Sequence, residues 1–156
     1  MTDLFSCAPP EKDPLWQELK PMPEGETTFE EVFSVLHRGH SEIEGEFIKY
    51  HFAEDAVEEV KFFYNKLVTR KAQITWDENR RGVLSKARGQ FMRLCMIKQA
   101  VQDALNAIDT IKRENGNPLN KDDDDLEWRR CIITKDTVIQ SAALMEYLIE
   151  VSKYNF

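Results

Sequence analysis

The sequence predicts a mainly α-helical protein, in which a single helical bundle domain carries at most a small extended element. Beyond residue 27, apolar residues recur at three- and four-residue steps over most of the chain, as amphipathic helices require. Five of the six prolines lie within residues 1–26. The length of 156 residues and the hydrophobic share of 42% suit one domain with one buried core. We therefore predict an extended proline-rich arm over residues 1–26 and a helical domain over residues 27–156.

The arm cannot form a regular helix, because proline fixes φ and lacks a backbone donor. Its apolar side chains are expected to dock onto another surface; they are Leu4, Phe5, Leu15 and Trp16.

The first helix should follow two overlapping capping boxes, in which Thr27 and Thr28 each precede a glutamate by three residues. It should end near Gly39. Residues 43–52 partly alternate apolar and polar side chains, so we expect a short strand or an extended lead-in there.

Two longer helices are predicted next, over about residues 54–70 and 84–111, with a linker over residues 73–82. The second of them is apolar over more than a third of its circumference, so it should lie at the centre of the domain with neighbours on several sides. Glycine and then proline, at Gly116 and Pro118, should stop it.

The final helix should begin after Thr134, a good N-cap residue, and continue to Val151. Before it, residues 119–127 are too acidic to pack and should form a solvated loop. Ile132 and Ile133 lead from this loop into the helix.

Composition narrows the classes of function. The net charge of −7 argues against a chain that coats nucleic acid or anionic lipid over its whole surface. No run of about 18 apolar residues exists, so we expect no membrane-spanning helix. Three widely spaced cysteines make no disulfide framework, and the N-terminus does not resemble a signal peptide. An intracellular location, in the cytoplasm or the nucleus, is therefore expected.

Motifs for catalysis are missing from the sequence. None of the six glycines precedes a lysine, so there is no phosphate-binding P-loop. A Gly-x-Ser-x-Gly elbow and a Cys-x-x-Cys pair are also absent. We therefore expect no enzymatic activity and no cofactor. We also expect no metal: His37 and His40 are better interpreted as polar residues at a helix end, and residues 122–125 as a solvated acidic loop.

Positive charge is concentrated in one part of this acidic chain. Between Asn79 and Gln102 there is no acidic residue, whereas six cations occur. Such a surface could meet phosphate or an acidic partner. Lys86 and Arg93, seven residues apart, should lie on one helix face as direct phosphate or nucleic-acid contacts. The supporting charges would be Arg80, Arg81 and Arg88. The alternative is that these cations only solvate a helix edge or pair with carboxylates elsewhere.

The segment Lys86–Leu94 also carries a family resemblance. It resembles the Lys-x-x-Gly-Gln-x-x-Arg-Leu signature of an uncharacterised family of phage, plasmid and mobile-element primase–helicase proteins. The order of the segments around this signature is also similar, over about residues 47–156. An aromatic-rich segment at residues 62–65 precedes the signature, and Ile133–Thr137 opens a later helix that contains residues 145–148. Less closely, the order resembles the helical lid that follows the AAA+ core of minichromosome-maintenance helicases, and residues 4–9 are similar to the last strand of that core.

This resemblance implies a sensor-like role for Lys86 and Arg93, which would reach a nucleotide held by an ATPase core. The chain itself has no P-loop and no Walker B strand, so it would be an isolated lid. We therefore expect a non-catalytic helical module that packs on a protein partner, or on the missing ATPase core, and presents a basic helix surface to nucleotide or nucleic-acid phosphate.

Two alternatives remain open. The chain could be a protein-interaction adaptor without a phosphate ligand, which binds through the arm and through Trp16, Trp76 and Trp128. A small enzyme is the least favoured, because no nucleophile, base and orienting group can be identified together.

Overall fold

The computed structural model describes residues 26–41, 49–114, 116–120 and 131–152. The elements there are α1 (Phe29–Ser41), β1 (His51–Phe52), α2 (Glu54–Gln73), α3 (Glu78–Arg113), β2 (Ile132–Ile133) and α4 (Lys135–Ser152). This confirms the mainly α-helical fold class and its small extended element. The predictions for the arm up to residue 25 and for the acidic run at 122–125 lie outside the described residues.

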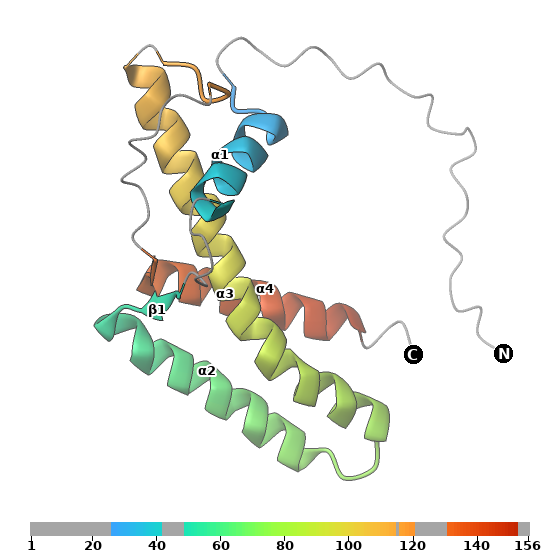
Figure 1. Cartoon of the computed structure of the whole chain (residues 1–156). Helices are drawn as coiled ribbons and strands as arrows, with labels where there is room; N and C mark the ends of the chain where they lie inside the picture. The colour runs from blue at the N-terminus through green and yellow to red at the C-terminus, as the bar shows by residue number, and fades with distance from the viewer. Residues whose placement is uncertain (1–25, 42–48, 115, 121–130, 153–156) are drawn as a thin grey trace, which may run out of the picture.

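Helix α3 is the axis of the fold (Figure 1). Its 36 residues span about 54 Å at about 1.5 Å per residue. Helix α1 packs against its C-terminal half through a small buried cluster that includes Val35 and Ile108. Helices α2 and α4 pack against its N-terminal half and against each other. The prediction that the longest helix is central is confirmed.

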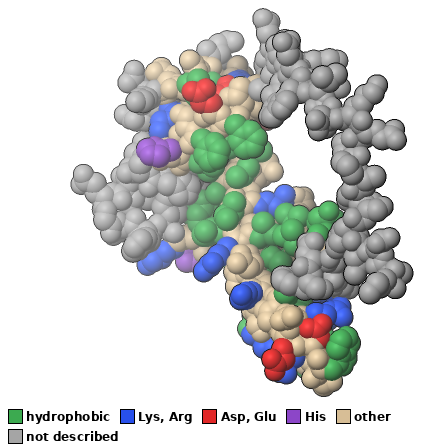
Figure 2. Space-filling model, turned by 90° about the vertical axis from the view of Figure 1, so that its right-hand side faces the viewer, with side chains coloured by type: hydrophobic (Ala, Val, Ile, Leu, Met, Phe, Trp, Pro, Cys, Tyr) green, Lys and Arg blue, Asp and Glu red, His purple; other side chains and the backbone are tan. Residues whose placement is uncertain are grey.

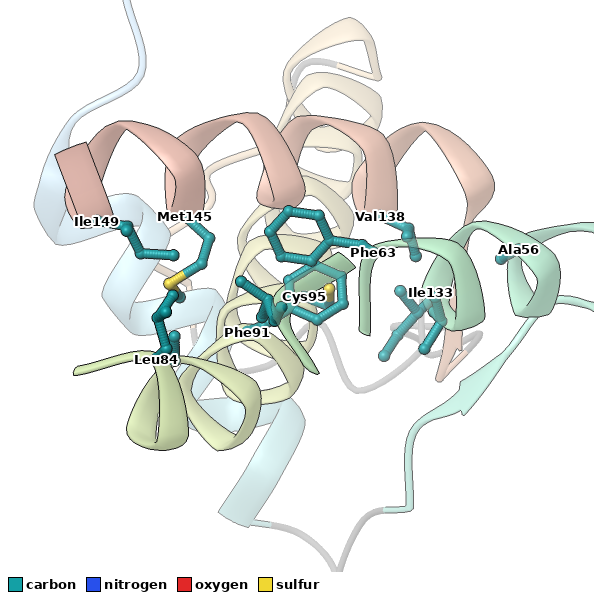
Figure 3. Packing of buried hydrophobic residues seen from close by; sticks show 12 residues of the cluster. Ala56, Phe63, Leu84, Phe91, Cys95, Ile133, Val138, Met145 and Ile149 are labelled. Carbon is teal, nitrogen blue, oxygen red and sulfur yellow. The ribbon is translucent and has the colours of Figure 1, made fainter. Parts of the chain in front are cut away.

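The larger core lies where α2, α3 and α4 meet (Figure 3). The rings of Phe63 on α2 and Phe91 on α3 are 4.6 Å apart, centroid to centroid, and tilted. Side chains of α4, among them Val138 and Met145, point toward this pair of rings and lie above it in this view. Three helices thus share one apolar centre, which fixes the position of α4 relative to α3.

Strands β1 and β2 form a two-residue parallel pair, in which His51 lies opposite Ile132 and Phe52 opposite Ile133. The His51 N–H donates to the carbonyl of Cys131 at 2.8 Å, and the Ala53 N–H donates to the carbonyl of Ile133 at 2.9 Å. The pair joins the start of α2 to the start of α4. Periodicity predicted extended backbone near residue 52, but it could not identify the strand that pairs with it.

The predicted linker over residues 73–82 is wrong. Helix α2 continues to Gln73 and α3 already begins at Glu78, so only residues 74–77 connect them. Asp77, which the sequence reasoning took as a loop residue, is the N-cap: its carboxylate accepts from the Arg80 N–H at 2.9 Å. Gly82 lies inside the helix, and an added Cβ there would meet nothing within 4 Å.

The start of α4 follows the prediction. The Thr134 hydroxyl accepts from the Thr137 N–H at 3.3 Å, which confirms Thr134 as the N-cap. The buried Gln99 of α3 holds this cap in place. Its Oε1 accepts from the Thr134 N–H at 3.1 Å and from the Thr137 hydroxyl at 2.7 Å, while its Nε2 donates to Asp103 at 2.8 Å.

Helix α1 begins with one of the two predicted capping boxes. The Thr28 N–H donates to Glu31 at 2.7 Å, and the Glu31 N–H donates to the Thr28 hydroxyl at 3.1 Å. Lys112, in the last turn of α3, donates to the same Glu31 carboxylate at 3.0 Å. Burial raises the pKa of Glu31, but the bonds from Thr28 and the charge of Lys112 outweigh it, so that its pKa lies below the ordinary value.

We expect Glu31→Gln to weaken the attachment of α1 in a pH-dependent way. A carboxylate with a lowered folded-state pKa adds stability above its unfolded-state pKa, and that stability is lost as the pH falls through the folded-state value. At pH 7 the variant should therefore be about 0.5–1 kcal/mol less stable, the range of a partly exposed ion pair, and the difference should disappear as the pH falls through the folded-state pKa. Thermal unfolding and amide exchange of α1 measure this. Glu30→Gln, at an exposed position of the same turn, is the control.

No helix within the described ranges combines the length and the apolar character needed to cross a bilayer.

Candidate functional site

The five cations assigned to a phosphate site fall into separate groups. Lys86 and Arg93 lie on the same side of α3 and line one groove between α3 and α4. Arg88 points to α2, where its guanidinium lies 5.4 Å from the centre of the Tyr64 ring and donates to the Tyr64 hydroxyl at 3.2 Å. Arg81 is exposed and seven residues from Arg88, hence on the Arg88 side of the helix.

Arg80 belongs to a different hollow, near the α2–α3 turn. This hollow of about 440 Å³ also receives Arg70, which pairs with Glu150 of α4 at 2.9 Å, and the cap residue Asp77. The structure therefore brings Lys86 and Arg93 together as expected, and it does not bring Arg80, Arg81 and Arg88 to the same surface.

The groove that Lys86 and Arg93 line has a volume of about 510 Å³. One wall is the outer face of α3, where Lys86, Gln90, Arg93 and Ile97 follow one another at helical spacing. The other lining side chains are apolar and come from both helices: Val83, Ala87, Leu94, Met145, Leu148 and Ile149.

Two of the apolar residues of this groove are unusually open to solvent. Ile97 is 56% exposed and Leu148 is 48% exposed. Leu144 and Val151 stand four residues before and three after Leu148, so they continue its exposed row along α4. Seen from the side toward which α4 runs, hydrophobic side chains gather next to Lys and Arg side chains (Figure 2). The groove is therefore an apolar trough with a cationic edge.

Within the part of the chain that the structure describes, no carboxylate forms an ion pair with Lys86 or Arg93. The two glutamates of the C-terminal half of α4 turn to α2 instead, where Glu146 pairs with Lys66 and Glu150 with Arg70. A third pair of opposite sense joins Lys135 of α4 to Glu59 of α2 at 3.2 Å. These ion pairs occupy the α2–α4 junction and leave Lys86 and Arg93 without an acidic partner among the described residues.

The glycine between the two cations faces open space. An added Cβ at Gly89 would meet nothing within 4 Å. No other element in the described part of the chain therefore approaches this glycine closely.

The other described candidates from the sequence lie outside the groove. Trp76 is 80% exposed at the α2–α3 turn, whereas Trp16 and Trp128 lie outside the described residues. His37 is exposed, and the side chain of His40 is not described. Over the described ranges, no three His, Cys, Asp or Glu side chains converge as metal ligands would.

Sequence reasoning missed the α4 wall of the groove. Leu144, Met145, Leu148 and Ile149 recur at helical spacing on one broad face of the final helix, and periodicity alone cannot tell which of them a neighbour covers. The signal available was the width of that face, which exceeds what one contact with α3 can bury.

Comparison with protein-family models, with curated proteins and with solved structures finds no match to the chain.

Proposed function

We propose that the chain is a non-catalytic helical module that binds a protein partner through the groove between α3 and α4. The observation that carries this proposal is the half-exposed apolar trough, with Ile97 and Leu148 open to solvent beside two cations that lack acidic partners among the described residues. Large apolar side chains that line one continuous hollow are typical of a surface that a partner covers. The cations would steer and orient an acidic group on that partner.

A protein partner accounts for the groove better than a phosphate ligand does. Binding of nucleic acid needs several cations along one surface, and among the described residues Lys86 and Arg93 are the only cations that line this groove. The lining of the groove is otherwise mostly apolar, which suits packing against side chains. Contact of Lys86 and Arg93 with a nucleotide or nucleic-acid phosphate, as the helicase-lid resemblance implies, stays a prediction, as do an ATPase core as the partner and an intracellular location.

Site-specific photo-crosslinking tests the proposal. A photoreactive amino acid at Gln90, in cells that express the chain, should give an adduct with another protein. The same amino acid at Asn106, exposed on α3 and outside the groove, is the control. Arg93→Glu should reduce the Gln90 adduct about three- to tenfold, because a favourable contact becomes a repulsive one, and Arg81→Glu on the other side of α3 should leave it unchanged. An adduct with nucleic acid, or equal adducts at Gln90 and Asn106, would contradict the proposal.

Salt dependence separates the two ligand classes in solution. If phosphate is the ligand, an oligonucleotide or ATP should bind the purified chain, with an affinity that falls steeply as salt rises. The groove proposal expects no such binding in fluorescence anisotropy, and a phosphate-dependent signal that Arg93→Glu removes would favour the lid-like role instead.

A further inference from the structure

We infer that the occupant of the groove is an acidic amphipathic helix of the partner, with two carboxylates about seven residues apart. This inference rests on the proposed function and adds the chemistry and shape of the bound element. The two walls of the groove differ in character: the α3 wall carries two cations, and the α4 wall is apolar.

The α3 wall sets the charge pattern. Lys86 and Arg93 are separated by seven residues, which is about 10.5 Å along the helix axis at about 1.5 Å per residue. Gln90 stands between them on the same row. Two carboxylates seven residues apart on a second helix have the same axial separation. A helix that runs alongside α3 can therefore place one acid against each cation.

The α4 wall sets the apolar pattern. Met145, Leu148 and Ile149 line the groove at three- and four-residue steps. On the α3 side, Val83 and Ile97 mark its two ends, 14 residues and about 21 Å apart. Ridges of this spacing accept the side chains of a packed helix about four turns long. The bound helix should thus carry its acids on the edge toward α3 and its apolar side chains toward α4.

Charge complementarity favours a foreign acidic segment over a second copy of this chain. Pairing two copies face to face through this groove would bring Lys86 and Arg93 of one toward the same cations of the other. The carboxylates of α4 that could relieve such repulsion already pair with α2. An acidic helix from another protein instead supplies the charges that the groove lacks.

Designed peptides test this inference on the full chain. The first probe is an alanine-based peptide of about 16 residues, with leucines at helical spacing and two glutamates seven residues apart on one edge of the leucine stripe. The second probe has lysines in place of these glutamates, and the third has alanines in place of the leucines. Binding is followed by fluorescence anisotropy, and amide chemical shifts locate the contact on α3 and α4.

We expect the glutamate peptide to bind in the groove, about tenfold more tightly than the lysine peptide and far more tightly than the alanine control. Arg93→Glu should reverse the order of the first two peptides, whereas Arg81→Glu should leave it unchanged. Such a reversal reports a direct charge contact, and loss of folding cannot mimic it. Equal binding of the two charged peptides, or no binding by either, would overturn the inference.

The crosslinking at Gln90 distinguishes failure of this inference from failure of the proposed function. A protein adduct at Gln90 together with inert peptides means that the module binds a partner of another shape or charge. An adduct that joins Gln90 to a second copy, or to the proline-rich arm of the same chain, also overturns the acidic helix as the occupant. An adduct with nucleic acid overturns both proposals.

Discussion

Replacing Phe91 by alanine is expected to cost about 3–5 kcal/mol of unfolding free energy, the range of buried Phe→Ala substitutions. Phe91 is fully buried at the point where α2, α3 and α4 meet, and its ring contacts that of Phe63. Alanine removes most of the side chain there and leaves a cavity that three rigid helices cannot close. Single domains are stable by only about 5–15 kcal/mol, so this loss approaches the limit for folding.

Urea denaturation followed by circular dichroism measures this effect. Met92→Ala is the matched control, because Met92 is the next residue along α3 and is 38% exposed. That variant should lose less than about 1 kcal/mol. If the two variants were equally stable, the arrangement of α2 and α4 around α3 would be wrong.

Replacing Gln99 by alanine is expected to cost about 2–3 kcal/mol, although the side chain is polar. The amide of Gln99 accepts from Thr134 and Thr137 and donates to Asp103, so it bridges α3 to the first turn of α4. Alanine removes the acceptor of the Thr134 N–H and of the buried Thr137 hydroxyl, and it removes one donor to the buried Asp103 carboxylate. Each hydrogen bond lost is worth about 0.5–1.5 kcal/mol, and more where a charged group takes part.

Gln102→Ala provides the comparison for Gln99→Ala. Gln102 is exposed on the same helix, and its amide donates to Asn106 at 3.2 Å. Its loss should change the unfolding free energy by less than about 0.5 kcal/mol. Hydrogen exchange adds a local readout, since Gln99→Ala should deprotect the first turn of α4 more than the middle of α2. Uniform deprotection of all helices would contradict a role specific to the α4 cap.

Helix α3 illustrates what periodicity could and could not establish. The apolar repeat from Leu84 to Ile108 predicted its central position, and the glycine and proline near residue 116 predicted its end. Its start was missed, because Asp77, Asn79 and Gly82 are all common in loops. A capping aspartate and a loop aspartate look the same in sequence, and the difference lies in one hydrogen bond to the Arg80 N–H.

Only part of the candidate site was predicted correctly from the sequence. Lys86 and Arg93 were expected to share a helix face, because seven residues are nearly two full turns, and both line one groove. Arg88 was expected beside them, but it lies on the other side of α3 against Tyr64. Because Arg88 is close to Lys86 and Arg93 in the sequence, all three were expected to form one cluster. Residues two or five positions apart, however, point to different sides of a helix.

By itself, the sequence determined the properties that depend on neighbours along the chain: the helices, the caps at Thr28 and Thr134, and the face shared by Lys86 and Arg93. Only the tertiary structure decided which surfaces remain uncovered. Whether Ile97 and Leu148 are buried or open depends on how α4 crosses α3, and whether a cation is neutralised depends on which way the carboxylates of α4 turn. Both depend on contacts between residues about 50 to 80 positions apart in the sequence, which local patterns do not encode.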